Sequence, residues 1–331
     1  MVEEWGGERG NLLGFSVISK NGATGPGPQK GGAWGLPWRG RAARIGEMKR
    51  RGWTGFAVAL AAVAWCAAAV AAPKRWVSFT VASANLSDND TQAYGPAGIR
   101  MLQALDPDVI GIQEFNYKEG TSADLVKRMF PRGDREFCRE RGGARLPNGV
   151  VSRFPVVAWG QWEDPYVKNR QLFWATVRLP GGKDLHVVSV HLVQNRANRR
   201  IPEADYLVER IRRQFPAKDY IVLCGDLNTG SRETGVMAVL GRIFDLQRVP
   251  ADQKGNPDTN SVRTHPYDVV LPNRALAPYE VKTVVGGLGF PDGIVFDTRL
   301  WSRPPFPARK DDAGASLQHL PVMKTFRVPV D

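Results

Sequence analysis

Short apolar runs bounded by turn residues recur from residue 77 to residue 328 of this 331-residue chain, and amphipathic segments separate several of them. Runs of this length are typical of buried strands, whereas apolar positions three to four residues apart predict helices. The predicted strands are 77–84, 109–112, 150–152, 156–159, 172–179, 185–190, 220–224, 267–271, 279–285 and 321–328. The predicted helices are 98–105, 122–130 and 202–214, with Pro202 in the first turn of the last one. Strands interleaved with helices from end to end predict a single α/β domain.

Polar side chains capable of chemistry lie at the ends of the predicted strands or in the adjoining loops. The set is Asn85, Glu114, His191, Asp226, Asn228, Asp268 and His319. In the segment 220–228, Asp226 and Asn228 are two residues apart and can therefore face the same side. The carboxyl ends of strands in an open sheet line the crevice where such folds bind ligands. The alternative for each residue taken alone is an ordinary turn or a solvated strand end.

The first 47 residues contain 12 Gly and three Pro and show no apolar periodicity. Such a segment cannot bury enough surface to offset the entropy of ordering it, so residues 1–47 are predicted to be disordered. We interpret this segment as an over-extended gene start, with Met48 as the native first residue.

Residues 48–71 have the pattern of a secretory signal peptide. Basic residues follow Met48, the 17 residues of 56–72 carry no charge, and Ala-Val-Ala at 69–71 provides small residues for cleavage. The alternative is an uncleaved anchor formed by residues 56–72, because that length is at the short limit for a spanning helix. The sequence therefore predicts a secreted or periplasmic protein, or a membrane-anchored one, with its folded domain at 72–331.

From residue 72 onward the chain keeps 36 of its 45 basic residues and 29 of its 33 acidic residues, which leaves a net charge of +7. This excess suits an anionic substrate or surface without selecting one. Arg196, Arg199 and Arg200 come soon after His191 and could reach phosphates near the site. A basic cluster without an aromatic stacking partner is not a nucleic-acid signature.

Two further residue types receive structural interpretations. Cys138 and Cys224 remain in the folded domain, and both are predicted to be buried free thiols rather than a disulfide framework. His186 is five positions from His191 on the same predicted strand, so the two side chains face opposite sides of the sheet. His186 is therefore predicted to be a structural or an exposed residue.

The polar motifs follow one another in a defined order. They are Asn85, Gln113-Glu114, Asn148-Gly-Val-Val-Ser-Arg-Phe-Pro155, Ser189-Val-His191-Leu, Gly225-Asp-Leu-Asn228, Tyr267-Asp268 and His319-Leu-Pro-Val. From about residue 77 to residue 326, this order resembles the endonuclease/exonuclease/phosphatase superfamily, which includes pancreatic-type deoxyribonucleases, apurinic-site endonucleases, inositol polyphosphate 5-phosphatases and bacterial sphingomyelinases. The resemblance implies a four-layer α/β sandwich, in which two mixed β-sheets pack face to face with helices outside and the site at one end.

The resemblance also implies metal-assisted hydrolysis of a phosphoester, with Mg²⁺ as the expected cofactor and Mn²⁺ as the alternative. A phosphodiester is negatively charged, so attack requires a cation at the phosphoryl oxygen and an activated water. Glu114 and Asn85 are the candidate metal ligands, since Mg²⁺ is usually held by one or two carboxylates. Asp226 is placed to orient or deprotonate the water. The candidate contacts to the substrate phosphate are Asn228, His191 and Arg196.

One position departs from the family pattern, which reads Ser-Asp-His near its end where this chain has Gln318 before His319. The family pattern assigns this histidine the role of general acid or base, paired with a preceding aspartate. Gln318 can accept a hydrogen bond from the imidazole but cannot stabilise its charge. Either His319 works with this weaker partner, or Asp292 or Asp297 supplies a carboxylate, or the enzyme is slow.

Asp268 is expected to orient a second site histidine, with His191 as the expected partner. The whole pattern predicts a secreted, metal-dependent phosphoester hydrolase, first of all a phosphodiesterase or nuclease. Within the same class, the alternative is a phosphatase or phospholipase C-type enzyme that acts on inositol phosphates or phosphorylated lipid headgroups. Outside it, the alternative is a catalytically weakened protein that binds anions. We expect a monomer without an obligate protein partner.

Overall fold

The computed structural model describes residues 75–330, apart from 88–94, 233 and 315–316. The predicted disordered segment 1–47, the predicted signal peptide 48–71 and the alternative anchor 56–72 lie outside these residues. Within the described part of the chain, no helix is both long enough and apolar enough to cross a membrane.

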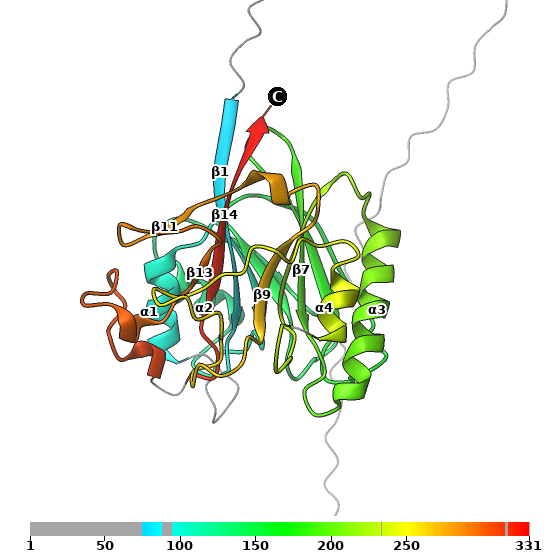
Figure 1. Ribbon diagram of the computed structural model, residues 1–331, viewed down its shortest axis with the longest axis horizontal. Coiled ribbons are helices and arrows are strands. Elements are labelled where there is room, and N and C mark those ends of the chain that lie inside the picture. The colour runs from blue at the N-terminus through cyan, green and yellow to red at the C-terminus, as the bar shows by residue number, and fades with distance from the viewer. Residues whose placement is uncertain (1–74, 88–94, 233, 315–316, 331) are drawn as a thin grey trace, which may run out of the picture. The chain divides into compact units, whose positions relative to one another are not determined.

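The described residues form two large β-sheets that pack face to face (Figure 1). The first sheet consists of β1 (Arg75–Asn85), β2 (Val109–Gln113), β3 (Glu136–Arg139), β4 (Gly149–Ser152), β10 (Glu280–Val281), β13 (Ile294–Val295) and β14 (Val322–Val330). Its strand order is β10-β14-β1-β2-β4-β3, and β13 pairs with β14 beside this path. The pair β1 and β2 is parallel and the other pairs are antiparallel.

The second sheet has five strands in the order β5 (Val156–Trp162), β6 (Leu172–Arg178), β7 (Asp184–His191), β8 (Tyr220–Asp226) and β9 (Asp268–Pro272). Here β7 and β8 run parallel and their neighbours are antiparallel. A separate hairpin joins β11 (Thr283–Val285) to β12 (Leu288–Phe290). Both sheets are therefore mixed, as predicted.

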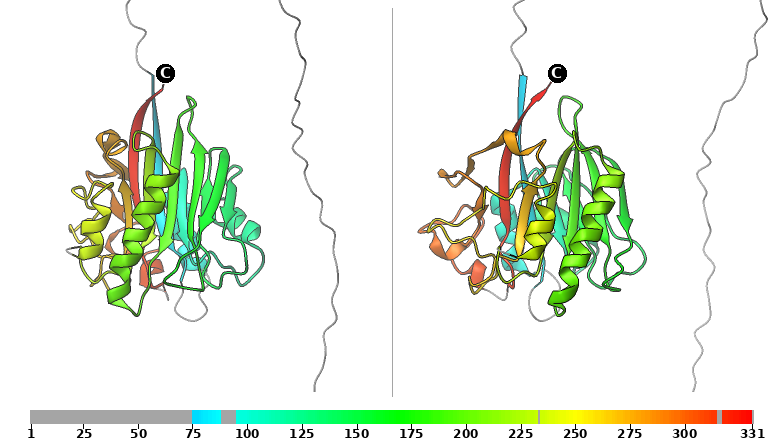
Figure 2. Two further views of the ribbon diagram at one scale, coloured as in Figure 1. Left: turned by 90° about the vertical axis from the view of Figure 1, so that its right-hand side faces the viewer. Right: turned by 45° about the vertical axis from the view of Figure 1, so that its right-hand side comes forward.

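Helices cover the outer face of each sheet (Figures 1 and 2). The first sheet carries α1 (Pro96–Leu105) and α2 (Ser122–Met129), and the second carries α3 (Ala197–Gln214) and α4 (Gly235–Leu240). Apolar positions drive this arrangement, because α3 buries Leu207, Val208 and Ile211 in one cluster with side chains of β7 and β8. Short 3₁₀ turns follow at η1 (Ala277–Tyr279), η2 (Thr298–Leu300) and η3 (Asp312–Gly314). The predicted four-layer α/β sandwich is confirmed.

Several predicted elements differ from the observed ones. The helix α3 begins at Ala197, so Pro202 is its sixth residue and does not lie in the first turn. The residues before Pro202 are mostly exposed and offer no apolar period from which to predict this start. The predicted strand 279–285 is broken, because Tyr279 ends η1 and the strands β10 and β11 join different sheets. The unpredicted elements α4, β3, β12 and β13 have six residues or fewer.

The two sheets approach each other closely at Gly111 of β2. A Cβ atom built there would lie 2.3 Å from the Cβ of Cys224 on β8, so only glycine leaves room for the facing side chain. Cys224 is fully buried and free, and burial raises the pKa of its thiol to about 12. Cys138 is also buried and free. The prediction of two buried free thiols is confirmed.

Substitution Gly111→Ala is expected to lower the free energy of unfolding by about 2 kcal/mol, because the added methyl overpacks the interface between the sheets. Urea unfolding followed by circular dichroism measures this loss. The matched control is Gly314→Ala, whose methyl would meet only Arg299 Cδ at 3.9 Å. Equal effects of the two substitutions would contradict the close approach of the sheets.

Candidate active site

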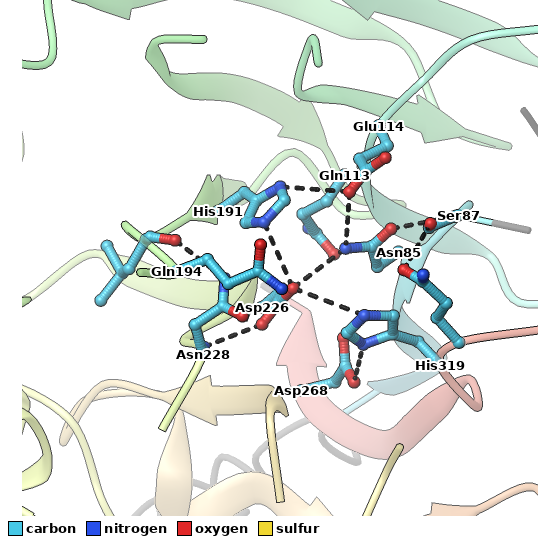
Figure 3. Close-up of polar contacts among 12 residues, drawn as sticks. Asn85, Ser87, Gln113, Glu114, His191, Gln194, Asp226, Asn228, Asp268 and His319 are labelled. Carbon is cyan, nitrogen blue, oxygen red and sulfur yellow. Dashed lines mark hydrogen bonds and ion pairs between the residues drawn. The ribbon is translucent and has the colours of Figure 1, made fainter. Parts of the chain in front are cut away.

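Strand register brings the predicted polar residues to one end of the sandwich. In the first sheet, Asn85 ends β1 directly beside the residue that precedes Glu114. In the second sheet, His191, Asp226 and Asp268 form one row across β7, β8 and β9. Since the sheets face each other, side chains from both meet in one cluster (Figure 3).

Asp226 lies at the centre of this cluster and is 1% exposed. Its Oδ2 accepts a hydrogen bond from Asn85 Nδ2 at 3.0 Å. The same oxygen lies 3.4 Å from His191 Nε2 and 3.7 Å from His319 Nε2 (Figure 3). Its Oδ1 accepts from the backbone N–H of Asn228 at 2.8 Å. The structure thus gathers four of the predicted residues around one buried carboxylate.

Two residues of the cluster adopt left-handed backbone conformations, Glu114 with φ 54° and Asn228 with φ 50°. Residues other than glycine seldom adopt this conformation, and such strain is found preferentially at functional sites. Glu114 comes directly after β2 and Asn228 two residues after the end of β8, so the unusual turn determines where their side chains leave the sheet. The side chain of Asn228 donates from Nδ2 to the carbonyl of Leu192 at 2.9 Å.

His319 pairs with Asp268, whose Oδ2 lies 2.8 Å from His319 Nδ1. This contact corrects the expectation that Asp268 orients His191. The physical reason is the strand order: β8, which carries Asp226, lies between the strand of His191 and that of Asp268. Asp268 Oδ2 also accepts from the hydroxyl of Thr259 at 2.7 Å, so the carboxylate is fixed before it contacts the imidazole.

Gln318 is not the partner of His319. Its Oε1 accepts a hydrogen bond from Ser87 Oγ at 2.6 Å, and its backbone N–H donates to the carbonyl of Ser87 at 3.3 Å. Gln318 therefore joins two loops at the edge of the cluster. The imidazolium of His319 does not depend on its neutral amide, because Asp268 is the partner.

The two aspartates considered as substitute partners are also engaged elsewhere. Asp297 accepts from Arg299 at 2.7 Å and lies 3.4 Å from Arg263. Asp292 acts electrostatically on the buried Lys324 and on Glu280. The expectation that either one serves the catalytic histidine is wrong, because Asp268 already occupies that position.

Burial and neighbouring charges determine the charge state of the site. Burial disfavours the imidazolium of His319, but the carboxylates of Asp268 and Asp226 outweigh it and raise the pKa of His319 to about 9. Burial raises the pKa of Asp226 to about 6, against the opposing charge of His319. Burial, followed by the positive charges of Arg170 and His319, holds the pKa of His191 well below its usual range. At neutral pH the site thus combines a cationic His319, an anionic Asp226 and a neutral His191.

Glu114 offers a position for a divalent metal ion. Its Oε2 is buried and has no hydrogen-bond partner among the described residues, while its Oε1 lies 3.4 Å from Asn85 Nδ2. A buried carboxylate oxygen without a partner is costly unless a cation or a water completes it. Burial raises the pKa of Glu114, an effect that a bound cation opposes. Glu114 Oε2 therefore offers an oxygen ligand that fits a hard cation such as Mg²⁺. Asn85 lies beside it as a hydrogen-bonding partner, because its Nδ2 faces the two carboxylates and its Oδ1 accepts from the backbone N–H of Ser87 at 3.0 Å.

A second group could also hold a metal ion. Asp226, Asp268 and His319 present ligand atoms that lie within 4.8 Å of one another. The Nδ1 atom of His319, however, already shares a hydrogen bond with Asp268, and Mg²⁺ prefers oxygen ligands. We therefore interpret this group as a hydrogen-bonded chain and Glu114 as the metal ligand.

A cavity of about 530 Å³ opens onto the cluster. The predicted site residues that line it are Glu114, His191, Arg196, Asp226, Asn228 and His319. Arg199 is not part of this lining, and the Arg200 guanidinium donates to the backbone carbonyls of Val193 and Gln194. Of the three predicted basic residues, only Arg196 borders the space where a phosphate would bind.

Arg170 lines the same cavity and was missed by sequence reasoning. It is 4% exposed, and its guanidinium donates to the backbone carbonyls of His191 and, at 2.8 Å, of Leu192. It lies in a polar segment with no periodicity, and the only sequence signal is its position just before the predicted strand at 172.

The structural role predicted for His186 is confirmed, because its ring stacks on Phe215 and hydrogen-bonds Thr176 Oγ1 at 2.9 Å.

Fold and site together define the class of two-sheet α/β sandwiches with an acid–base cluster at one end. A family model described as the Endonuclease/Exonuclease/phosphatase family matches residues 99–309, and the chain belongs to this family. Asn85 and His319 lie outside the matched segment, yet the structure places them within the cluster. The family is generally dependent on divalent metals, and membership supports the hydrolysis of a phosphoester.

Solved structures with a similar fold come from several organisms. An endonuclease/exonuclease/phosphatase from Beutenbergia cavernae is 17% identical with a TM-score of 0.53, and the match covers 76% of this chain and 72% of that one. A family protein from Bacteroides thetaiotaomicron is 13% identical with a TM-score of 0.52, covering 76% and 98%. The human Nocturnin catalytic domain, solved with a bound sulfate anion, is 13% identical with a TM-score of 0.51, covering 77% and 97%. These identities establish the fold alone, and no curated protein matches the chain significantly.

Proposed function

We propose that this protein is a divalent-metal-dependent phosphodiesterase or nuclease that cleaves its substrate with water. The observation that carries the proposal is the arrangement around Asp226. This buried carboxylate contacts Asn85, His191 and His319 at the bottom of a cavity, beside a Glu114 oxygen that has no partner among the described residues. A base, an acid and a metal position within one cluster are what hydrolysis of a phosphoester requires.

Glu114, with Asn85 beside it, would hold the metal ion, for which Mg²⁺ is the first candidate and Mn²⁺ the alternative. When bound, such an ion polarises a phosphoryl oxygen and lowers the pKa of its water. Asn85 Nδ2 contacts Asp226 at 3.0 Å and Glu114 at 3.4 Å, and so fixes the two carboxylates relative to each other. Replacement of Asn85 would therefore disturb both the ligand and the base.

Asp226 acts as the base that takes the proton of the attacking water. Its Oδ1 is held by the N–H of Asn228, so Oδ2 is the oxygen that faces the other groups of the cluster. His191 is neutral and can donate from one ring nitrogen to a phosphoryl oxygen, and the side-chain amide of Asn228 has a second hydrogen available for the same purpose. Arg196 adds positive charge at the cavity wall.

His319 acts as the general acid that protonates the leaving oxygen. Its raised pKa keeps the imidazolium populated at neutral pH, and the bond from Nδ1 to Asp268 directs Nε2 toward the reacting groups. The sequence alternative of a weakened anion-binding protein rested on Gln318 as the partner of this histidine. Because Asp268 holds His319 instead, that argument loses its basis.

The substitution Asp268→Asn is expected to move the alkaline limit of kcat/KM to lower pH by at least about one unit, because the Asp268 charge holds up the pKa of His319. In the wild type, the rate falls as pH rises through about 9, where His319 loses its proton. The pH profile with bis-p-nitrophenyl phosphate measures both limits. Asp219→Asn is the matched control, since Asp219 lies 3.5 Å from the structural His186. An unchanged alkaline limit in Asp268→Asn would refute the assignment of His319 as the acid.

Comparison of substrates tests the proposed activity itself. The purified protein with Mg²⁺ or Mn²⁺ is expected to cleave bis-p-nitrophenyl phosphate and DNA or RNA faster than p-nitrophenyl phosphate, inositol phosphates or sphingomyelin. The reverse preference would assign the protein to the phosphatase or phospholipase C-type alternative. Anion binding without turnover would support the binding-protein alternative.

We also propose that residues 48–71 direct export and are removed, which leaves 72–331 as the mature domain. This proposal rests on the sequence pattern, since these residues lie outside the described part of the chain. Mass spectrometry of the native protein is expected to find its N-terminus at or next to residue 72. An intact 56–72 segment in the membrane fraction would indicate an anchor instead, and peptides upstream of Met48 would refute the proposed start.

A further inference from the structure

Side chains from outside the strand hold three consecutive residues at the end of β7. Arg170 donates to the carbonyls of His191 and Leu192, and Asn228 donates to the carbonyl of Leu192 at 2.9 Å. The next backbone group, the N–H of Val193, donates to Glu203 Oε2 at 2.8 Å. The position of His191 therefore depends on Arg170 and Asn228, which line the cavity, and on Glu203, which is not part of the cavity lining.

Two buried carboxyl groups form the outer part of this support. Glu203 on α3 is 0% exposed and Asp164 in the loop after β5 is 4% exposed. Glu203 Oε1 and Asp164 Oδ2 are both buried and accept no hydrogen bond from a donor among the described residues. Asp164 acts on Glu203 through its charge and a side-chain hydrogen bond, which two carboxyl groups can form only when one of them is protonated. Two carboxylates in buried contact do not both ionise, because their repulsion is hardly screened.

We propose that Asp164 and Glu203 share a single proton and, together with Arg170, form a support that positions His191 for catalysis. The catalytic part of this inference rests on the proposed function, whereas the shared proton does not. With one proton, the carboxyl pair carries one negative charge opposite the permanently charged guanidinium of Arg170. With no proton, two negative charges face each other beside the Val193 N–H.

Burial and the neighbouring Asp164 favour the protonated form of Glu203. Burial raises the pKa of Glu203 to about 9, and the charge and hydrogen bond of Asp164 act in the same direction. The Val193 N–H and the Arg170 charge oppose this effect, but do not overcome it. On α3 itself, the nearby Arg200 guanidinium is engaged with the carbonyls of Val193 and Gln194.

The shared proton makes stability depend on pH with a defined sign. Glu203 keeps its proton in the folded state up to about pH 9, whereas the unfolded chain releases it near 4.5, the ordinary pKa of a glutamate side chain. Within this window the folded state binds more protons, so this group contributes less stability as pH rises. Glutamine at 203 can donate to Asp164 and accept from Val193 as protonated glutamate does, but it does not titrate.

The first part of the test compares wild type with Glu203→Gln. The Tm of the wild type is expected to fall relative to that of the variant as pH rises from 5 to 9. Asp164→Asn is expected to weaken this dependence, because burial still raises the pKa of Glu203 when the charge of Asp164 is gone. Glu209→Gln is the matched control on the exposed side of α3, where Glu209 pairs with Arg212. The amide resonance of Val193 should shift as pH passes through about 9 in the wild type and stay constant in Glu203→Gln. A Tm difference that is constant with pH, or an unresponsive Val193 amide, would overturn the shared proton.

The second part of the test concerns positioning. At pH 7, Glu203→Ala is expected to lower kcat for bis-p-nitrophenyl phosphate by about tenfold or more with KM within about threefold, while Glu203→Gln retains the wild-type kcat. A glutamine variant as slow as the alanine variant would overturn the positioning role. If the wild type hydrolyses no phosphoester, the proposed function and this role fail together, while the Tm and amide measurements still decide whether the proton is shared.

Discussion

Substitution His319→Ala is expected to lower kcat/KM for phosphodiester hydrolysis by about 10³, because it removes the general acid and its charge from a buried site. The imidazolium lies 3.7 Å from Asp226 Oδ2 and is held by Asp268, and the other histidine beside this oxygen, His191, has a pKa well below its usual range and is neutral. Steady-state kinetics at pH 7 with saturating Mg²⁺ would measure the loss, with circular dichroism to show that the fold is kept.

The control for this substitution is its neighbour. Gln318→Ala removes a hydrogen bond to Ser87 but leaves the pair of His319 and Asp268 intact, and it is expected to retain activity within about tenfold. The two substitutions alter adjacent positions of one loop, but only His319→Ala removes the imidazole that pairs with Asp268. If Gln318→Ala were as slow as His319→Ala, Gln318 would be required for catalysis, which would contradict the pairing of His319 with Asp268.

Substitution Glu114→Ala is expected to lower metal-dependent turnover by about 10³ and to weaken Mg²⁺ binding, because it removes the only carboxylate that we assign to the metal. Isothermal titration with Mg²⁺ or Mn²⁺ provides a readout that does not depend on turnover. The argument comes from Glu114 Oε2, which is buried and lacks a hydrogen-bond partner within the described part of the chain.

A matched control is Glu119→Ala, five residues further along the chain. Glu119 is 58% exposed and pairs with Arg128 on the surface, so its loss should leave both metal binding and turnover unchanged. Retention of metal affinity in Glu114→Ala would instead favour the group of Asp226, Asp268 and His319 as the ligand set.

The location of the site could be predicted from the sequence because its residues lie at the ends of strands or in the adjoining loops. Asn85 and Asp226 end strands, Glu114 follows one, and a strand places such a residue at a defined edge of its sheet. The α/β class could be predicted from the alternation of strands and helices, and the layer arrangement from the resemblance of the motif order to the family. Such patterns can be recognised in the sequence because they depend on residues that are neighbours in the chain.

The pairing within the site could not be predicted in the same way. Whether Asp268 meets His191 or His319 depends on strand order in the second sheet, and strand order results from packing between distant segments. Arg170 escaped notice for a related reason, since it lies in a loop and becomes distinctive only when the end of β7 packs against it. For the same reason, Gln318 was expected to determine how well His319 works, although the actual partner of His319 is Asp268, 51 positions away in the sequence.

The most direct test of the central claim compares wild type with Asp226→Asn in the hydrolysis of bis-p-nitrophenyl phosphate. Asparagine keeps the size and shape of the side chain and one accepting oxygen, but it cannot take a proton from water. The wild type should turn over only with a divalent metal present, and the variant should lose at least about 10³ in kcat while it retains its fold and its binding of the metal. Metal-independent turnover, or an Asp226→Asn enzyme as fast as the wild type, would contradict the account.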